Sequence, residues 1–403
     1  MATSQSNPAQ VAAEQSAAYN QAAIKAMASG DLAGAESALL RALGLDRRNV
    51  PAWLNLAAIR RQRDELDGAF AAIQEVLQLD ARNFPALLMS ATMLEREGRA
   101  VPAARAYAAA LANAPPDTRL DAATLQAVRR GRAVHEAYTT QLGEHVRASV
   151  AAASDQCSGA ERRRLESFID TTVRVRRRYR QEPTDYFYPG LPAIDFYDRT
   201  EFPWLEEFES RTSAIGQELA DILREDAAGF APYIHYAPHM PLDQWAELNH
   251  SSRWTAFEFY DKGELIADRA RRAPATIEAV SRLPQAAVAL RSPCAMYSAL
   301  QPKTRIPPHT GVANFRLVVH LPLVIPPGCG FRVGGETREW RVGEAWVFDD
   351  TIEHEAWNEG DQPRYVFICD IWSPRLSPAE RAAIAAVIAA TDAFNGTVPV
   401  AHV

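Results

Sequence analysis

The same pattern of apolar and polar residues recurs along the first third of the chain at a spacing of 34 residues. The positions in register are Ala35 with Ala69 and Ala103, Leu45 with Leu79, Asp46 with Asp80, Asn49 with Asn83, and Pro51 with Pro85. A repeat of this length holds one helical hairpin, in which small alanines let the two helices pack closely. We expect the proline to end the second helix of each hairpin and to set the next turn. The pattern therefore predicts stacked helical hairpins over residues 18–119.

The spacing of apolar residues changes from helical to strand-like after about residue 186. Residues 115–183 stay helical and become heavily charged, which favours a solvated connecting segment over a basic patch for an acidic partner. Beyond Trp254, short alternating runs are separated by Gly and Pro, which is typical of strands. The predicted strands are 255–260, 294–300, 315–325, a hairpin over 331–342 that turns at Gly334 and Gly335, 344–350 and 364–372. Many short strands indicate a sandwich or a barrel.

One further helix is predicted to pack on that barrel. Ser377 is its expected N-cap, with Pro378 in the first position and Glu380 at the capping-box position. Together these patterns predict an α+β protein. The expected parts are a flexible segment over 1–17, the hairpins over 18–119, a helical linker over 120–185 and a strand-rich domain over 186–403.

Composition and charge exclude several classes of protein. With 47% hydrophobic and 23% charged residues, the 403-residue chain is neither disordered nor fibrous. We expect a cytoplasmic protein without a membrane partner, because no apolar run reaches ~18 residues and the start lacks the pattern of a secretory signal. A net charge of -7 argues against a nucleic-acid partner. The 4 cysteines are too scattered for a disulfide scaffold or a zinc site.

Two histidines of the strand-rich half lie where a metal could bind. His309 lies just before one predicted strand and His354 just after another. Strand ends converge at the mouth of a jelly roll, so two such histidines can bind one metal there. A non-haem iron site usually adds a carboxylate two residues after the first histidine, where this chain has Gly311. Spacing alone leaves a metal site and structural histidines both open.

Polar residues on the neighbouring strands strengthen the case for a site. Alternation places Arg316, Val318 and His320 on one face of their strand, opposite Phe315, Leu317, Val319 and Leu321. Arg364 opens the strand that follows His354, and an interior arginine with its fork of donors requires an anion such as a carboxylate. Ser298, on an upstream strand, offers a hydroxyl to the same anion.

Several stretches of the sequence together resemble the aspartyl/asparaginyl β-hydroxylase family. They are HTGVANFRLVVHLPLVIP from His309, FDDTIEHEAW from Phe348, Arg364 ten residues after His354, and DIWSP from Asp370. The resemblance covers roughly residues 186–380, and the repeats before it resemble a tetratricopeptide array. It implies an all-α repeat solenoid followed by a double-stranded β-helix, the jelly-roll or cupin fold. It also implies an oxygenase that uses Fe(II), 2-oxoglutarate and O2.

The resemblance implies a role for the residues around the metal. His309 and His354 would bind iron, and the family too lacks a carboxylate at the position of Gly311. Asp350, four residues before His354, would orient the iron-bound water as the catalytic carboxylate.

The resemblance also implies which residues hold the cosubstrate. Arg364 with Ser298 would bind the distal carboxylate of 2-oxoglutarate, and His320 would contact the carboxylate beside the keto group. Arg316 would face either that carboxylate or the acidic side chain of the substrate. The chain departs from the animal enzymes at Val318, where they carry a second arginine.

The implied reaction is hydroxylation of the β-carbon of Asp or Asn in a protein or peptide, which the repeat array would dock. Three other functions stay open. They are a hydroxylase of a small-molecule, carrier-bound or lipid acyl substrate, a 2-oxoglutarate halogenase with chloride in place of the carboxylate, and an inactive repeat scaffold.

His235 and His239 are spaced as a helical metal pair would be. Pro238 lies between them and makes a regular helix improbable, which favours loop histidines.

Overall fold

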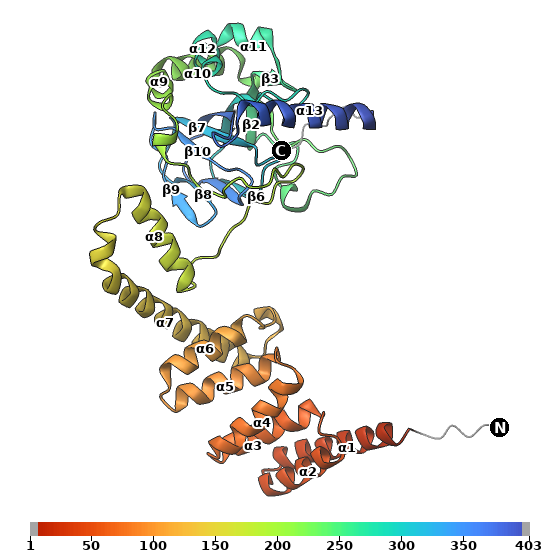
Figure 1. Cartoon of the computed structure of the whole chain (residues 1–403). Coiled ribbons are helices and arrows are strands. Elements are labelled where there is room, and N and C mark those ends of the chain that lie inside the picture. The colour runs from red at the N-terminus through yellow and green to blue at the C-terminus, as the bar shows by residue number, and fades with distance from the viewer. Residues whose placement is uncertain (1–6, 397–403) are drawn as a thin grey trace, which may run out of the picture. The chain divides into compact units, whose positions relative to one another are not determined.

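The structure is a computed structural model that describes residues 7–396, and the chain divides into two compact units, Met1–Val175 and Arg176–Val403. The first unit is helical, and its helices up to α6 form antiparallel hairpins (Figure 1). They are α1 (Pro8–Ala28), α2 (Leu32–Leu45), α3 (Val50–Gln62), α4 (Leu66–Leu79), α5 (Phe84–Arg96) and α6 (Ala100–Leu111), followed by α7 (Ala122–Ser154) and α8 (Gly159–Thr172). Within residues 7–396, no helix is both long and apolar enough to cross a bilayer. The predicted tetratricopeptide-like solenoid is confirmed.

The repeated alanines lie where the hairpins pack. Ala35, Ala69 and Ala103 are fully buried, as close helix packing requires. The prolines have a different role from the one we predicted. Pro51 and Pro85 lie in the first turns of α3 and α5, where a backbone N–H needs no partner, instead of ending the preceding helices.

Residues 8–17, which we expected to be flexible, form the first turns of α1. The side chain of Asn7 accepts a hydrogen bond from the amide of Ala9 and so caps the helix, with Pro8 in the first turn. Ser16 is buried and donates to the carbonyl of Ala42 over 2.8 Å. An N-cap followed by proline is a start signal that the sequence already contained.

The second unit is built on two antiparallel sheets. The larger sheet has the order β1-β2-β5-β12-β7-β10, and the smaller has the order β6-β11-β8-β9. Their bounds are β1 Ala231–Pro232, β2 Trp254–Glu258, β5 Ala295–Leu300, β6 Thr304–His309, β7 Arg316–Val324, β8 Cys329–Val333, β9 Glu336–Arg338, β10 Trp346–Phe348, β11 His354–Asn358 and β12 Arg364–Trp372, with the small β3 (Tyr260–Asp261) and β4 (Glu264–Leu265) pair apart. From β5 onward the chain passes back and forth between the two sheets, which is the winding of a jelly roll. The predicted double-stranded β-helix is confirmed.

Our strand assignment missed β6 and β11. β6 contains Pro307 and Pro308, which argue against a strand, but β6 lies at the edge of its sheet, where missing donors are tolerated. The positions of the two histidines are corrected accordingly. His309 ends β6 and His354 begins β11, so each lies inside a strand and not beside one.

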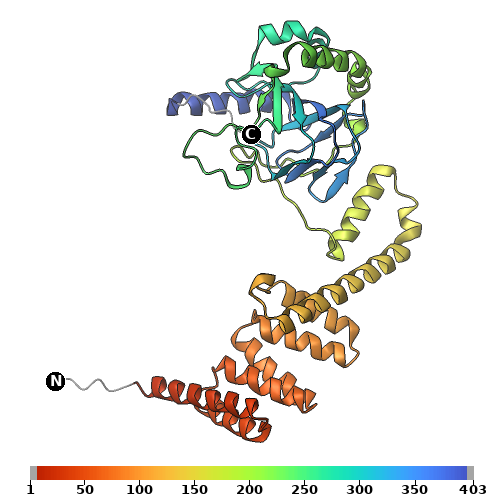
Figure 2. The ribbon, with the colours of Figure 1, turned by 180° about the vertical axis from the view of Figure 1, so that it is seen from behind.

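Helices cover the outer face of the larger sheet. Figures 1 and 2 show α10 (Thr212–Asp226) and α12 (Pro274–Ser281) on this side, with α9 (Leu205–Ser210) and α11 (Ala267–Arg272) beside them. Ile215 and Leu219 of α10 share one apolar core with Leu317 and Val319 of β7. α13 (Pro378–Asn395) begins with the predicted capping box of Ser377 and Glu380 and packs elsewhere on the jelly roll.

We predict that Asn49→Ala destabilises the helical unit more than the matched Asn83→Ala. Both side chains cap a helix, but Asn49 also donates to Ser16 over 2.8 Å, whereas Asn83 reaches only the exposed Asp80. Loss of a cap costs about 1 kcal/mol, and a partly buried hydrogen bond adds about 1 kcal/mol. Urea unfolding followed by far-UV circular dichroism should show the difference, and equal midpoints would contradict it.

Candidate active site

Strand pairing brings the two predicted metal ligands together. His354 of β11 and His309 of β6 are cross-strand partners, and their ring centroids lie 4.0 Å apart. Each Nδ1 lies next to a backbone carbonyl, 2.8 Å from that of Pro307 and 3.1 Å from that of Ile352. A carbonyl can only accept, so each Nδ1 carries the proton. Both Nε2 lone pairs are therefore free for a metal.

The burial of both rings keeps them neutral. Burial lowers the pKa of His309 to about 3 and that of His354 to about 4. Neutral imidazole is the form that binds a metal. Over residues 7–396, no group of three or more His, Cys, Asp or Glu side chains is arranged to hold a metal.

The carboxylate of Asp350 fills the space beside Gly311. A Cβ atom at position 311 would lie 2.1 Å from Oδ2 of Asp350, so only glycine fits. The backbone supports this approach, because the amide of Gly311 donates to the carbonyl of Asp350 over 2.7 Å. Asp350 is buried, and its Oδ1 has no hydrogen-bond partner among the described residues. Position 311, where a non-haem iron site usually has a carboxylate, is therefore a glycine because the side chain of Asp350 occupies the adjacent space.

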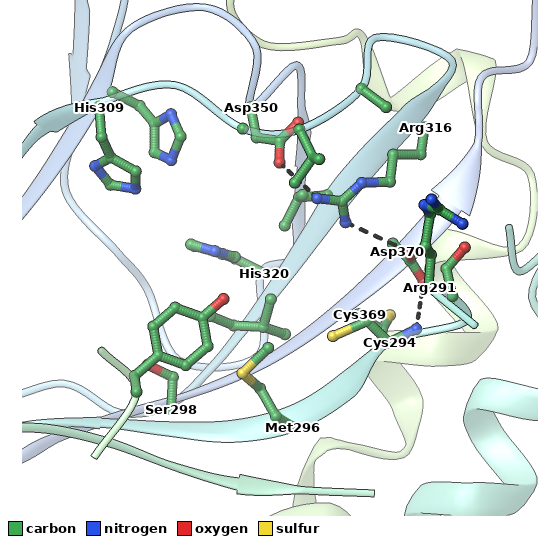
Figure 3. A pocket seen from close by; sticks show the side chains of 18 of the residues that line it. Arg291, Cys294, Met296, Ser298, His309, Arg316, His320, Asp350, Cys369 and Asp370 are labelled. Atoms are coloured by element: carbon green, nitrogen blue, oxygen red, sulfur yellow. Dashed lines mark hydrogen bonds and ion pairs between the residues drawn. The ribbon is translucent and has the colours of Figure 1, made fainter. Parts of the chain in front are cut away.

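Arg316 lies between two buried carboxylates, as Figure 3 shows. Its Nη2 is 3.2 Å from Oδ2 of Asp350, and its Nη1 is 3.4 Å from Oδ2 of Asp370. Burial alone would lower the pKa of Arg316, but the two carboxylates outweigh it and raise the pKa. Burial raises the pKa of Asp370 to about 6. We predicted no role for Asp370, although alternation along β12 places its side chain on the same face as that of Arg364.

Arg364 is a buried cation without a carboxylate partner. It is 1% exposed, and no acidic side chain of residues 7–396 lies within ion-pair distance. Its Nη2 donates to Oγ of Ser298 over 3.3 Å, and its guanidinium lies 5.0 Å from the ring centroid of Trp340. Burial lowers its pKa to about 10. Ser298 also accepts from Nε1 of Trp254, so its own hydroxyl proton remains free to donate.

All seven predicted site residues line one cavity of about 360 Å³. The list is Ser298, His309, Arg316, His320, Asp350, His354 and Arg364. His320 is buried, its Nδ1 has no hydrogen-bond partner within residues 7–396, and burial holds its pKa well below the usual value. We predicted that Leu317 and Phe315 face away from the site. Leu317 of β7 does so and packs in the outer core, but Phe315 precedes the strand and lines the cavity.

A segment before the sheets holds the loops that carry these residues. The amide of Glu182 donates to the carbonyl of Thr351 over 2.7 Å, and that of Thr184 donates to the carbonyl of Gly311 over 3.0 Å. Nε2 of Gln181 reaches Oδ2 of Asp349 over 2.5 Å. These contacts explain why the second unit begins ahead of residue 186, where we placed its start.

The apolar remainder of the cavity was not predicted. Its lining includes Val288, Leu290, Met296, Phe315 and Ile368. Figure 3 shows Met296, Cys294 and Cys369 on the side away from His309. His235 also contributes to the lining and lies with His239 in the loop before β2, as expected of loop histidines.

The fold and the cavity together define a jelly-roll domain with a partly charged cavity. Residues 209–374 match the model of the family described as aspartyl/asparaginyl beta-hydroxylase. The chain is 35% identical over 149 residues to the aspartyl/asparaginyl beta-hydroxylase of Homo sapiens, which is 37% of this chain and 19% of that protein.

Two further likenesses concern different parts of the chain. It is 30% identical over 198 residues to the ornithine lipid ester-linked acyl 2-hydroxylase of Rhizobium tropici, covering 47% of this chain and 64% of that protein. The structure is also similar to the TPR domain of Arabidopsis OM64, with 21% identity and a TM-score of 0.27, over 30% of this chain and 97% of that one. The chain spans less than two thirds of the length of these curated relatives.

We predict that Gly311→Ala destabilises the protein by about 1–3 kcal/mol, because the new methyl group meets the carboxylate of Asp350. The control Gly216→Ala adds a methyl group with no atom within 4 Å and should be neutral or stabilising by up to ~1 kcal/mol. Thermal unfolding measures both. The double variant Gly311→Ala/Asp350→Ala should recover part of the loss, and no recovery would show that the clash lies elsewhere.

Proposed function

We propose that the Arg176–Val403 unit is an Fe(II)- and 2-oxoglutarate-dependent dioxygenase that hydroxylates the β-carbon of Asp or Asn in a protein or peptide substrate. The observation that carries the proposal is Arg364, a buried cation without a carboxylate, in the same cavity as two neutral paired histidines. A buried charge without a partner is costly, so this end of the cavity favours an anionic ligand. The family match of residues 209–374 supports hydroxylation as the reaction.

The residues present fit both groups that the reaction needs. Nε2 of His309 and of His354 would hold iron, and the unpaired Oδ1 of Asp350 would orient a water on it. Arg364 and the free hydroxyl proton of Ser298 would bind the distal carboxylate of 2-oxoglutarate. When bound, iron with 2-oxoglutarate and O2 supplies the oxidant that replaces C–H with C–OH.

The protein's own contribution is positioning and the exclusion of water. The rings of Trp245 and Trp254 pack against His309, with centroids 5.0 and 6.4 Å away, and limit its movement. His320, which packs between Phe331 and Phe348 at 5.0 and 4.8 Å, would offer a ring nitrogen to the carboxylate beside the keto group. Rigid placement of the reacting groups lowers the barrier without new chemistry.

Two of the open alternatives lose support. In a halogenase, chloride binds the metal in place of the carboxylate that usually follows the first histidine by two residues. Here the side chain of Asp350 fills the space beside Gly311, which is that position. An inactive scaffold would not need a buried arginine aimed into a cavity, because that charge lowers stability when no ligand is bound.

A second candidate function is hydroxylation of a lipid acyl chain. The cavity lining away from the histidines is largely apolar and includes Val288, Leu290 and Met296. The relative from Rhizobium tropici carries such an activity in its name. Against this candidate, a repeat solenoid serves a polypeptide substrate better, because stacked hairpins usually present a docking face. We also propose that the protein is cytoplasmic and has neither a nucleic-acid nor a membrane partner.

Anaerobic addition of Fe(II) and 2-oxoglutarate should give the weak visible charge-transfer band of a chelated complex. We expect the band in the wild type and in His239→Ala, which changes a histidine outside the cavity lining, and its loss in His309→Ala and Arg364→Ala. Absence of both the band and 2-oxoglutarate turnover in the wild type would exclude the proposal.

Arg364→Met should separate stability from ligand binding. Without ligand, the variant should be as stable as the wild type or more stable by about 1–4 kcal/mol, because it removes a buried charge that has no anionic partner. Addition of 2-oxoglutarate with a redox-inert divalent metal should raise the wild-type melting temperature but not that of the variant. A ligand-free variant several kcal/mol less stable than the wild type would show that Arg364 has a structural role instead.

A further inference from the structure

The cation nearest the metal side of the cavity is already neutralised. Arg316 directs its two terminal nitrogens at Asp350 and Asp370, over 3.2 and 3.4 Å. Two carboxylates therefore share one guanidinium. A third carboxylate, brought in by a substrate, would meet a cluster with no spare positive charge.

The other cations of the lining cannot take that role. Arg291 is held by Asp392 of α13 through a bidentate pair, with Nη2 and Oδ1 2.7 Å apart, and it lies over the ring of Tyr186. Lys262 is exposed in the turn between β3 and β4, where water screens its charge. Arg364 lies beside Ser298 and is the residue that the cosubstrate requires.

Val318 adds no positive charge to this region. It lies between Arg316 and His320 on the inner face of β7, is 8% exposed and pairs across the sheet with Asp370. The valine side chain offers no hydrogen-bond donor. The polar groups around Arg316 are the carboxylates of Asp350 and Asp370, which can only accept, and the hydroxyl of Tyr233 and the thiol of Cys294, which are neutral and bring no positive charge.

From this geometry we infer that the site selects substrates that are uncharged beside the reacting carbon, so that a peptide asparagine is preferred over an aspartate. The inference rests on the proposed function and specifies its substrate. An amide group is neutral and can be buried here without a counter-ion, whereas an aspartate carboxylate would be buried without a cation.

The test compares two probes that differ only in the reacting side chain, N-acetyl-L-asparagine amide and N-acetyl-L-aspartic acid α-amide. Each is added to the Fe(II) and 2-oxoglutarate complex of the full chain, and the stimulation of 2-oxoglutarate decarboxylation is recorded. We expect the asparagine probe to act with an efficiency on the order of tenfold or more above that of the aspartate probe.

Asp370→Asn should narrow this preference. In the wild type, the amide of Cys294 donates to Oδ1 of Asp370 over 2.8 Å, and an asparagine oxygen can still accept this hydrogen bond. The substitution removes one of the two carboxylates that neutralise Arg316. The ratio between the probes should fall toward one. Asp361→Asn, an equal charge change at an 89% exposed side chain, should leave the ratio as in the wild type.

The results distinguish failure of the proposed dioxygenase activity from failure of the proposed preference for asparagine. A wild-type protein without the charge-transfer band and without 2-oxoglutarate turnover fails as a dioxygenase. With the band present, equal responses to the two probes, a preference for aspartate, or no response to either probe overturns the inference about selectivity. An unchanged ratio in Asp370→Asn shows that Arg316 does not set the preference, and this result also overturns the inference.

Discussion

The balance of buried charge organises the interior of the second unit. An ion taken out of water costs several kcal/mol unless it finds an opposite charge in good geometry. Arg316 meets that condition within the chain, because Asp350 and Asp370 lie on either side of it. Arg364 does not, since among residues 7–396 it has the hydroxyl of Ser298 and the ring of Trp340 beside it but no acidic side chain. One buried cation of the cavity is thus neutralised within the chain, and the other is not.

The histidine pair depends on a strand that proline keeps at the edge of its sheet. Pro307 lacks a backbone donor, so β6 can be paired on one side only. Its carbonyl is then available to the ring of His309, fixing which nitrogen carries the proton. Pairing of β6 with β11 sets the position of His354 opposite that ring. Strand register and ring protonation therefore have a common origin in this edge.

The sequence contained the periodic part of this structure but not its contacts between loops. The period of 34 predicted the helical hairpins, and alternation placed Arg316 and His320 on one face of β7. β6 and β11 were missed because each is short and β6 carries two prolines. Alternation applied to β12 would have found Asp370. The approach of Asp350 to Gly311 is different, because it depends on two loops that meet only in the folded chain.

The glycine at position 311 leaves the space that the carboxylate of Asp350 occupies. Because that residue has no side chain, the carboxylate near the histidines comes from Asp350 on another loop. That carboxylate is held by Arg316, which is held in turn by Asp370 on β12. Under the proposed function, the guanidinium that orients Asp350 would therefore be the same group that a substrate carboxylate would need. Arg316 would then fix Asp350 and would not be available to recognise an acidic substrate side chain.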